Sequence, residues 1–368
     1  MPKLKNKQYS PLIIFLLAEI LFTLAGFSQV KYPAPVEGDY MAKDFSFAGG
    51  EKLPLLKLHY TIIGKPQRDK EGMVTNAVLI MHGTSGSGSS FLNERFAGQL
   101  FGPGQLLDAE KYCIILPDGI GHGKSAKPSD GLHMRFPKYT YDDMVSADYH
   151  LLTEHLQINH LRLVMGTSMG GMHTWVWGYQ YPGFMDALLP LASLPVTIAG
   201  RNRIQRKMAI DLIKMDPEWK GGEYTQQPKL GLSGAISSLI FMTSSPLQWQ
   251  KTAPTREQSE IMLDNLEKRY LSTLDANDFI YQFDASREYN PQPYLAKIKA
   301  PLLAINSADD QVNPPELGIM EKEIKNVAKG RYVLLPITDQ TNGHGTHSLP
   351  AIWGNYLAEL LKISEPSK

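Results

Sequence analysis

The sequence is poor in cysteine: Cys113 is the only one among 368 residues, so no intramolecular disulfide can form. Cysteine usage therefore leaves the redox compartment open. Cys113 lies in the apolar run 112–116, where a free cysteine is expected to be a packed core residue. No cysteine lies near Gly26 that could carry a lipid anchor.

Charge of one sign is lacking as well. Lys and Arg number 37, as do Asp and Glu, so the formal net charge is zero. Proteins that bind nucleic-acid backbones usually carry a basic footprint. Beyond the first residues, the chain has no Lys/Arg block of the kind that holds proteins to anionic membranes. We therefore expect no nucleic-acid partner and a small substrate that is neutral or weakly charged.

Nucleotide and metal motifs are missing too. Neither G-x-G-x-x-G nor a Walker sequence occurs; Gly123-Lys124-Ser125 comes nearest, but Asp118 stands where a Walker loop has its first glycine. His344 and His347 form H-x-x-H, yet two histidines without a nearby carboxylate on a stable helix make a poor zinc site. We expect no cofactor and no metal.

A long apolar run occurs at the N-terminus and nowhere later. Three lysines precede the run 12–25, which Glu19 interrupts, and Gly26-Phe27-Ser28 offers small residues for cleavage before Gln29. This arrangement is typical of a signal peptide, here residues 1–28. An uncleaved membrane anchor is the alternative, although the run falls short of the ~20 residues that span a bilayer. We expect a secreted or periplasmic protein with no stable membrane insertion after processing.

The rest of the chain alternates strand and helix patterns, which predicts a mostly parallel sheet flanked by helices, an α/β fold. The expected strands are 55–63, 77–81, 112–116, 161–165, 187–191, 301–305 and 332–335, and the expected helices are 141–155, 171–181, 315–327 and 348–361. The alternation stops between Pro195 and Pro301, where helical spacing takes over, for example at Leu263, Leu266, Tyr270 and Leu274. We predict a core of residues 29–195 and 296–368, with 196–295 inserted as a helical cap over the strand ends where ligands bind.

A G-x-S-x-G sequence, Gly166-Thr167-Ser168-Met169-Gly170, follows an apolar strand pattern and precedes a helical one. In that context the motif marks a nucleophile elbow, a sharp turn that lifts the serine hydroxyl clear of the sheet. Its glycines are needed because side chains there would collide with neighbouring backbone. The pattern predicts Ser168 as a nucleophile.

A serine nucleophile needs a histidine base and an acid that orients the histidine. Both follow in the order Ser, acid, His, each after an apolar run. Asp310 is preferred to Asp309 because Pro314 follows it by four residues, and Asp309 stays the alternative acid. His344, flanked by glycines, is preferred to His347 as the base.

An oxyanion on the substrate would be stabilised by two backbone N–H groups. The expected donors are the amide of Met169, the residue after the nucleophile, and the amide of Thr84, in the loop after the strand 77–81. Gly83 lets the chain turn close to the substrate, so we count it as a substrate-binding residue. His82 is expected to be a structural hydrogen-bonding residue. The run 85–90, rich in glycine and serine, is expected to be a flexible pocket wall.

Basic residues cluster at the start of the predicted cap, in the segment 201–207. We select Arg206 as a substrate-binding residue that would hold a substrate carboxylate through a bidentate pair. A solvated helix face is the alternative explanation of this cluster, because charge runs usually face water.

Several segments resemble the homoserine O-acetyltransferase branch of the α/β-hydrolase superfamily, from about Ala77 to the last helix. They are Phe136-Pro137 through Asp142-Asp143-Met144-Val145, Ser168-Met169-Gly170-Gly171-Met172, Met215-Asp216-Pro217-Glu218-Trp219, Gly222-Glu223-Tyr224 and Asp275-Ala276-Asn277-Asp278. The resemblance implies an α/β-hydrolase fold with a helical cap, a triad of Ser168, Asp310 and His344, and a homodimer formed through the caps. One segment, 117–125, departs from the acetyltransferases and is similar to the corresponding loop of ordinary hydrolases.

Acetyl-CoA is a cytoplasmic metabolite, so an exported enzyme would lack that acyl donor. We therefore expect an exported serine hydrolase that cleaves an ester or related acyl substrate through an acyl-enzyme intermediate. One alternative is an O-acyltransferase of the homoserine O-acetyltransferase type. Another is a non-catalytic, ligand-binding pseudohydrolase.

Overall fold

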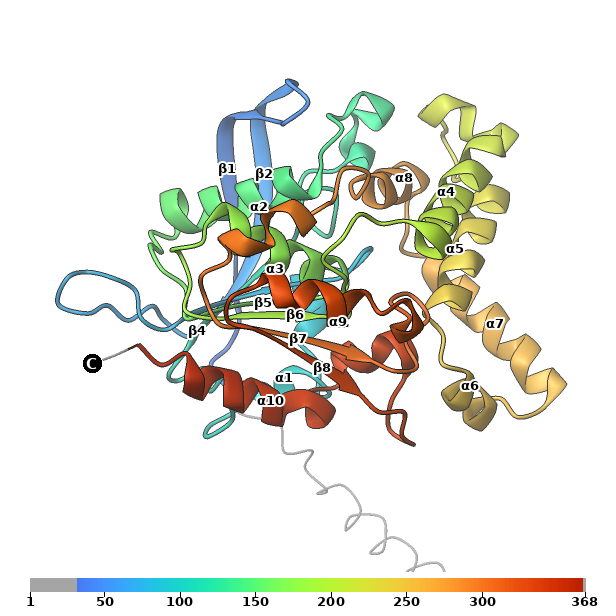
Figure 1. The fold of residues 1–368 in the computed structure, drawn as a ribbon. Coiled ribbons are helices and arrows are strands. Elements are labelled where there is room, and N and C mark those ends of the chain that lie inside the picture. Colours follow the sequence, from blue (N-terminus) through green and yellow to red (C-terminus); the bar gives the residue numbers. More distant parts are fainter. Residues whose placement is uncertain (1–31, 367–368) are drawn as a thin grey trace, which may run out of the picture. The chain divides into compact units, whose positions relative to one another are not determined.

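The computed structural model describes residues 32–366 and shows a sheet of eight strands in the order β1-β2-β4-β3-β5-β6-β7-β8 (Figure 1). The first two pairings, β1 with β2 and β2 with β4, are antiparallel, and the others are parallel. The strands are β1 Val36–Ser46, β2 Lys52–Ile63, β3 Ala77–Met81, β4 Cys113–Pro117, β5 Leu163–Thr167, β6 Leu188–Leu191, β7 Leu302–Ser307 and β8 Gly330–Leu335.

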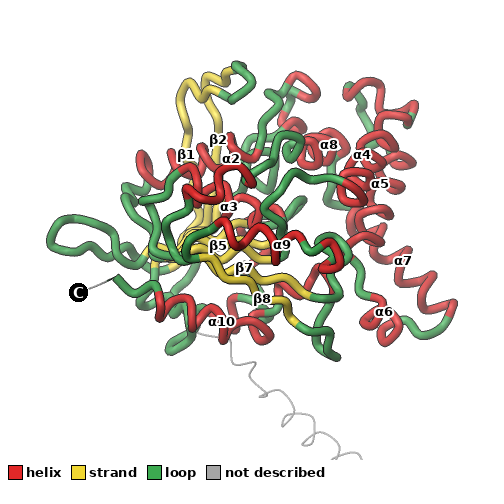
Figure 2. The backbone as a smooth tube through the Cα atoms, viewed as in Figure 1, coloured by secondary structure: helices red, strands yellow, loops and turns green. Residues whose placement is uncertain are grey.

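The central strands are apolar throughout because helices cover both faces of the sheet. Along β3, Leu79 and Met81 pack into one core with helices α2 and α3, while Val78 and Ile80 pack into a second core with α1 and α10. Figures 1 and 2 show these two layers of helices on opposite sides of the strands. The predicted fold class, a mostly parallel sheet flanked by helices, is confirmed.

All seven predicted strands are present, and β1 is an eighth that the sequence analysis missed. β1 pairs antiparallel with β2 at the edge of the sheet, and most of its side chains are exposed or partly exposed. An edge strand with so little burial lacks the continuous apolar run on which the prediction relied.

The flanking helices are α1 Ala97–Leu100, α2 Tyr141–His150, α3 Met169–Gln180, α9 Ile319–Glu323 and α10 Pro350–Ile363. The helix predicted over 315–327 is wrong as a continuous element, because Gly318 adopts a left-handed conformation with φ 61° and separates a short turn from α9. The last helix begins at Pro350 instead of Ser348, and a 3-10 turn, Gly343–Ser348, precedes it.

Five helices lie between β6 and β7, within the predicted insertion 196–295. They are α4 Gly200–Met215, α5 Lys229–Thr243, α6 Pro246–Thr252, α7 Arg256–Leu271 and α8 Ala276–Asp284. They enclose an apolar core of their own, which includes Ile213, Ile236 and Phe279. The predicted apolar face of α7 is partly wrong, because Leu263 is exposed and Leu274 lies beyond the end of the helix.

Several large apolar side chains of the insertion are exposed: Ile204, Met208, Met215, Leu230, Phe241, Leu247, Ile261 and Leu263. The homodimer through the cap, which the resemblance implies, stays a prediction.

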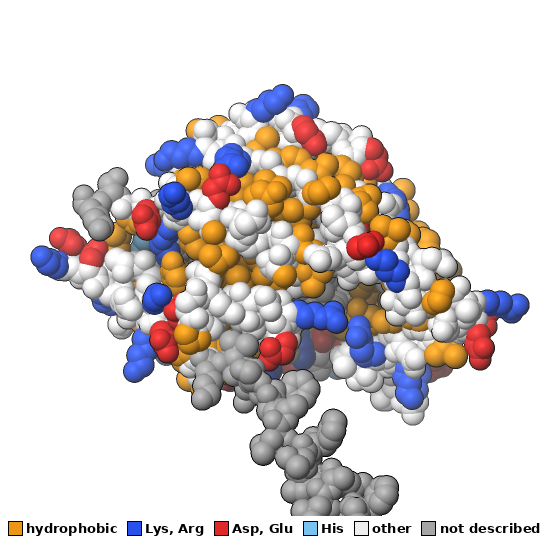
Figure 3. All heavy atoms as spheres, turned by 90° about the horizontal axis from the view of Figure 1, so that it is seen from below, with side chains coloured by type: hydrophobic (Ala, Val, Ile, Leu, Met, Phe, Trp, Pro, Cys, Tyr) orange, Lys and Arg blue, Asp and Glu red, His pale blue; other side chains and the backbone are white. Residues whose placement is uncertain are grey.

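Basic and acidic side chains are interspersed on the face of the molecule shown in Figure 3, with no continuous region of one sign.

Backbone segments approach each other very closely at the turn between β5 and α3. Ser168 has φ 56° and ψ −110°, a conformation that few residues other than glycine adopt. A Cβ atom on Gly166 would lie 2.1 Å from the Gly170 carbonyl oxygen, and one on Gly170 would lie 2.0 Å from that of Met81. Both glycines of the motif are therefore required by backbone contact, as the sequence analysis predicted.

Cys113 begins β4 and is fully buried, which agrees with the expectation that it is a packed core residue.

The predicted signal peptide, residues 1–28, lies outside the described residues and stays a prediction. Within 32–366 no single helix is long and apolar enough to cross a membrane, whereas α5 and α6 together reach that length and composition but are bent by 106°.

Candidate active site

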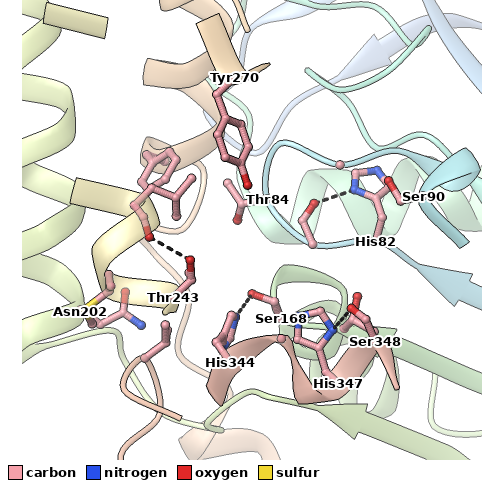
Figure 4. A pocket seen from close by; sticks show the side chains of 18 of the residues that line it. His82, Thr84, Ser90, Ser168, Asn202, Thr243, Tyr270, His344, His347 and Ser348 are labelled. Carbon is pink, nitrogen blue, oxygen red and sulfur yellow. Dashed lines mark hydrogen bonds between the residues drawn. The ribbon is translucent and has the colours of Figure 1, made fainter. Parts of the chain in front are cut away.

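The carboxyl ends of three parallel strands bring the predicted serine, histidine and acid together. Ser168 follows β5, Asp310 follows β7, and His344 lies in the turn Gly343–Ser348 after β8. His344 Nε2 lies 2.8 Å from Ser168 Oγ (Figure 4). On the other side of the ring, His344 Nδ1 lies 2.9 Å from Asp310 Oδ2. Because a carboxylate only accepts, Nδ1 donates to Asp310 and leaves Nε2 to accept the serine proton.

Asp310 is buried and held as a carboxylate by several donors. Its Oδ1 accepts a hydrogen bond from the Val312 amide at 2.8 Å, and its Oδ2 accepts one from Asn313 Nδ2 at 2.9 Å. Burial alone would raise the pKa of Asp310, but the charge and hydrogen bond of His344, with those donors, keep this pKa below its usual value. The group beside His344 therefore stays charged at neutral pH.

Asp309, the alternative acid, faces a different partner. Its Oδ2 accepts a hydrogen bond from the Gly343 amide at 2.9 Å, and its Oδ1 accepts one from Ser307 Oγ. It holds the backbone next to His344 and does not bond to the imidazole. The geometry thus agrees with the preference for Asp310 over Asp309.

His347 does not occupy the position of a base. Its Nδ1 lies 2.9 Å from Ser348 Oγ, and its ring packs edge-to-face on His344 with the ring centroids 5.2 Å apart. Burial, with the charge of His344, lowers the pKa of His347 to about 3. A neutral ring that lies beside His344 without bonding to Ser168 agrees with the preference for His344.

Within residues 32–366, no three histidine, cysteine or acidic side chains lie close enough together to form a candidate metal site.

The two predicted oxyanion donors flank Ser168. The Met169 amide begins α3, and Thr84 belongs to the segment 82–90 after β3, which we call the oxyanion loop. A Cβ on Gly83 would lie 3.4 Å from Ser168 Cβ, so this loop passes directly beside the nucleophile. In the described part of the chain, neither the Thr84 nor the Met169 N–H has a backbone acceptor. Both donors are left for a ligand oxygen.

The oxyanion loop is anchored, whereas the sequence analysis predicted a flexible wall. His82 Nδ1 donates to the Gly83 carbonyl at 2.8 Å, and His82 Nε2 accepts the Gly119 N–H at 3.0 Å. Both ring nitrogens are therefore used, and burial lowers the pKa of His82, which agrees with the structural role expected for it. Farther along, the Gly88 amide donates to Asp118 Oδ1 at 2.7 Å.

A cavity of about 310 Å³ opens above Ser168 between the core and the insertion. Its apolar lining includes Phe91 and Phe96 from the core and Leu239, Met242 and Phe283 from the insertion. Tyr270 of α7 points into the cavity toward Thr84 (Figure 4). This volume is at the low end of ligand sites. These insertion residues cannot be assigned to a cavity from the sequence, because side chains at helical spacing look the same whether they face a core or a cavity.

Arg206 lines this cavity and is 5% exposed, so the solvated-face explanation is wrong for this residue. Its hydrogen-bond partners are neutral: Asn202 Oδ1 at 2.9 Å, Ser286 Oγ at 3.1 Å and, weakly, the Phe283 carbonyl at 3.5 Å. Its guanidinium also lies over the Phe283 ring. No acidic side chain lines the cavity among the described residues. Buried cations are normally paired, so this guanidinium is suited to an anionic ligand.

Comparison with known proteins gives a consistent family assignment. The alpha/beta hydrolase fold family matches residues 76–336. A probable acyltransferase from Methanothermobacter thermautotrophicus is 32% identical over 279 residues, which cover 76% of this chain and 84% of that protein. A homoserine O-acetyltransferase from Pelobacter propionicus is 31% identical over 309 residues, with coverage of 73% and 81%.

Solved structures of proteins with two different activities share the fold of this chain. The homoserine O-acetyltransferase from Bacillus anthracis superposes with a TM-score of 0.78 at 22% identity, covering 89% of this chain and 97% of that one. The acetyl esterase MekB superposes with the same TM-score of 0.78 at 24% identity and the same coverage, 89% and 97%. At these identities the likeness establishes the fold and leaves the choice between the two activities open.

The two adjacent acids give a direct test of the geometry. Asp310→Asn should slow the labelling of Ser168 by a fluorophosphonate by about a thousandfold or more, because only the residue bonded to His344 fixes its tautomer. Asp309→Asn keeps an oxygen for the Gly343 amide and should slow labelling by less than about tenfold. Labelling is followed by intact-protein mass spectrometry. Equal, modest losses in both variants would place the acid elsewhere.

Proposed function

The chain belongs to the alpha/beta hydrolase fold family, in its homoserine O-acetyltransferase-like branch, and we propose that it transfers acyl groups from esters through an acyl-enzyme on Ser168. The observation that carries the proposal is the hydrogen-bonded chain from Ser168 through His344 to Asp310 at the floor of a cavity. A pseudohydrolase, the non-catalytic alternative, would have no need of this arrangement.

In the proposed mechanism, Ser168 Oγ attacks the ester carbonyl carbon while His344 Nε2 takes its proton. The carbonyl oxygen becomes an oxyanion that the Thr84 and Met169 amides stabilise. When the carbon–oxygen bond to the alcohol breaks, His344 returns the proton to the leaving oxygen, and the acyl group stays on Ser168. An acceptor hydroxyl then gives its proton to His344 and attacks the acyl carbon; the bond from this carbon to Ser168 Oγ breaks, and His344 returns the proton to Oγ.

The lining of the cavity favours water or an uncharged hydroxyl compound as the acceptor. Homoserine carries an ammonium group, and burying an ammonium without a carboxylate partner is costly. Among residues 32–366, no Asp or Glu lines the cavity, and the positive charge of Arg206 would repel the ammonium group. The geometry therefore supports ester hydrolysis best.

O-Acyl transfer to homoserine is the second candidate, and the comparisons favour it. The curated relatives are named homoserine O-acetyltransferase or probable acyltransferase, so on their names alone acyl transfer has more support than hydrolysis. Arg206 would suit the carboxylate of homoserine as well as that of an acidic ester. The two activities share the acyl-enzyme and differ in the acceptor, so one assay separates them.

The acyl-enzyme is tested with p-nitrophenyl acetate, in the absence and presence of homoserine. Ser168→Ala and His344→Ala should each lower turnover by about three orders of magnitude or more, and the double variant little further, because the two groups act as one unit. O-Acetylhomoserine formation, measured by chromatography, would favour the second candidate over hydrolysis. Activity retained in His344→Ala but lost in His347→Ala would show that the base is misassigned.

Arg206 is proposed to select substrates that carry a carboxylate. Arg206→Ala should raise KM for an acidic ester such as a hemisuccinate by about tenfold to a hundredfold, the usual range for a lost charge-assisted hydrogen bond. KM for a neutral ester of similar size should change little. Lys207→Ala is the matched control, because Lys207 is exposed on the same helix and pairs with Asp211. Equal kinetics of both variants on both esters would remove Arg206 from the substrate site.

Export is proposed from the sequence alone, since the N-terminal segment lies outside the described residues. The lysines, the apolar run 12–25 and the small residues before Gln29 support cleavage near Ser28. Mass spectrometry of native protein from its source should find an N-terminus near Gln29. Intact protein that begins at Met1 in the cytoplasmic fraction would contradict export and would make acetyl-CoA available as the acyl donor.

A further inference from the structure

One buried side chain of the insertion bonds directly to the oxyanion loop. Gln282 of α8 is 5% exposed. Its Oε1 accepts a hydrogen bond from Ser85 Oγ at 2.7 Å, and its Nε2 donates to the Gly121 carbonyl at 2.8 Å. A single side chain thus ties the insertion to two loops of the core.

Ser85 is the residue next to Thr84, and its backbone is strained. It has φ 62°, in the left-handed region that a serine rarely adopts. Such a conformation persists only where the surroundings hold it. The Thr84 N–H belongs to the Gly83–Thr84 peptide, whose carbonyl oxygen accepts the Gly86 N–H at 3.0 Å. Ser85 lies inside the turn that this hydrogen bond closes, so whatever holds Ser85 also helps to fix the direction of the Thr84 N–H.

The two bonds require a side chain that donates and accepts. The Gly121 carbonyl can only accept, so Nε2 must face it, and Oε1 is then presented to the Ser85 hydroxyl. A leucine would fill the volume with neither bond. A glutamate would keep an acceptor for Ser85 but would set an oxygen against the Gly121 carbonyl.

We propose that Gln282 is a positioning residue that fixes the Thr84 amide through Ser85 and so couples the inserted helices to oxyanion stabilisation. This inference rests on the proposed acyl transfer at Ser168. Gln282 bonds to Ser85 and Gly121 and is not part of the cavity lining, so its effect is carried by the backbone of the oxyanion loop. The insertion then contributes to the chemical step in addition to lining the cavity.

A general contact between insertion and core would be the simpler explanation, and α8 offers a comparison. Asp278, on the same helix, accepts hydrogen bonds from the amide and hydroxyl of Ser129 at 2.8 Å and 2.7 Å. This tie joins α8 to the core but does not reach the oxyanion loop. Loosening it should not disturb the Thr84 amide.

The test compares Gln282→Leu and Ser85→Ala with Ser129→Ala as the control, using p-nitrophenyl acetate and a boronic acid that forms a charged tetrahedral adduct on Ser168. Removing an oxyanion donor lowers kcat by about 100-fold or more. Gln282→Leu and Ser85→Ala should only displace the Thr84 donor, so each should lower kcat by about tenfold or more and change KM by less than about twofold. Boronate affinity should fall in parallel with kcat/KM. The Gln282→Leu/Ser85→Ala double variant should lose little beyond either single variant. Ser129→Ala should keep kcat and boronate affinity.

The outcomes separate this inference from the function on which it rests. Wild-type protein without Ser168-dependent turnover would overturn both. Ser168-dependent turnover with wild-type kcat in Gln282→Leu and Ser85→Ala would overturn the inference alone, as would equal losses in Ser129→Ala. Thermal unfolding checks that each variant is folded. Should Gln282→Leu not fold, Ser85→Ala, which removes one hydroxyl, and Gln282→Glu carry the test.

Discussion

The site depends on one backbone contact, where α3 begins against the end of β3. Because Gly170 has no side chain, its Cα can lie against the Met81 carbonyl, and because Gly166 has none, the chain can reverse at Ser168. That reversal gives Ser168 its unusual φ and places the first amide of α3 beside the hydroxyl. His82, the residue after Met81, accepts the Gly170 N–H at its carbonyl, so the oxyanion loop starts from the same contact. The Ser168 hydroxyl and the two proposed oxyanion donors are therefore positioned together by the packing of a strand against a helix.

The electrostatics of the cavity set the site apart from a simple apolar pocket. Arg206 is buried among neutral partners, and no carboxylate in the described lining offsets its charge. The negative charge nearest to the reaction, on Asp310, is engaged by His344 and Asn313. A ligand that brings an anionic group would relieve the cost of the unpaired guanidinium, whereas one that brings a cation would add to it. Charge thus limits which ligands suit the cavity, although its walls are mostly apolar.

The sequence was sufficient for the features that depend on local pattern. Continuous apolar runs identify the strands covered on both faces, and the spacing of glycines around Ser168 identifies the elbow. The order of Asp310 and His344 after Ser168 can also be read along the chain, although the three residues lie far apart in sequence. The rest could not be read from the sequence: β1 is an exposed edge strand, and the burial of Arg206 depends on the packing of α4 against α8. The bond between Ser85 and Gln282 joins residues 197 positions apart, and no periodicity along the chain encodes it.

The single thiol has a consequence for experiments on the insertion. Cys113 is fully buried, and burial raises its pKa to about 12. Because the thiolate is the nucleophile, such a thiol reacts slowly with maleimides at neutral pH. A cysteine introduced at an exposed position of the insertion, such as Phe241, would therefore take a fluorophore without removal of the natural residue. The native background is in effect already thiol-free, so a fluorophore on α5 would report on the position of this helix relative to the core.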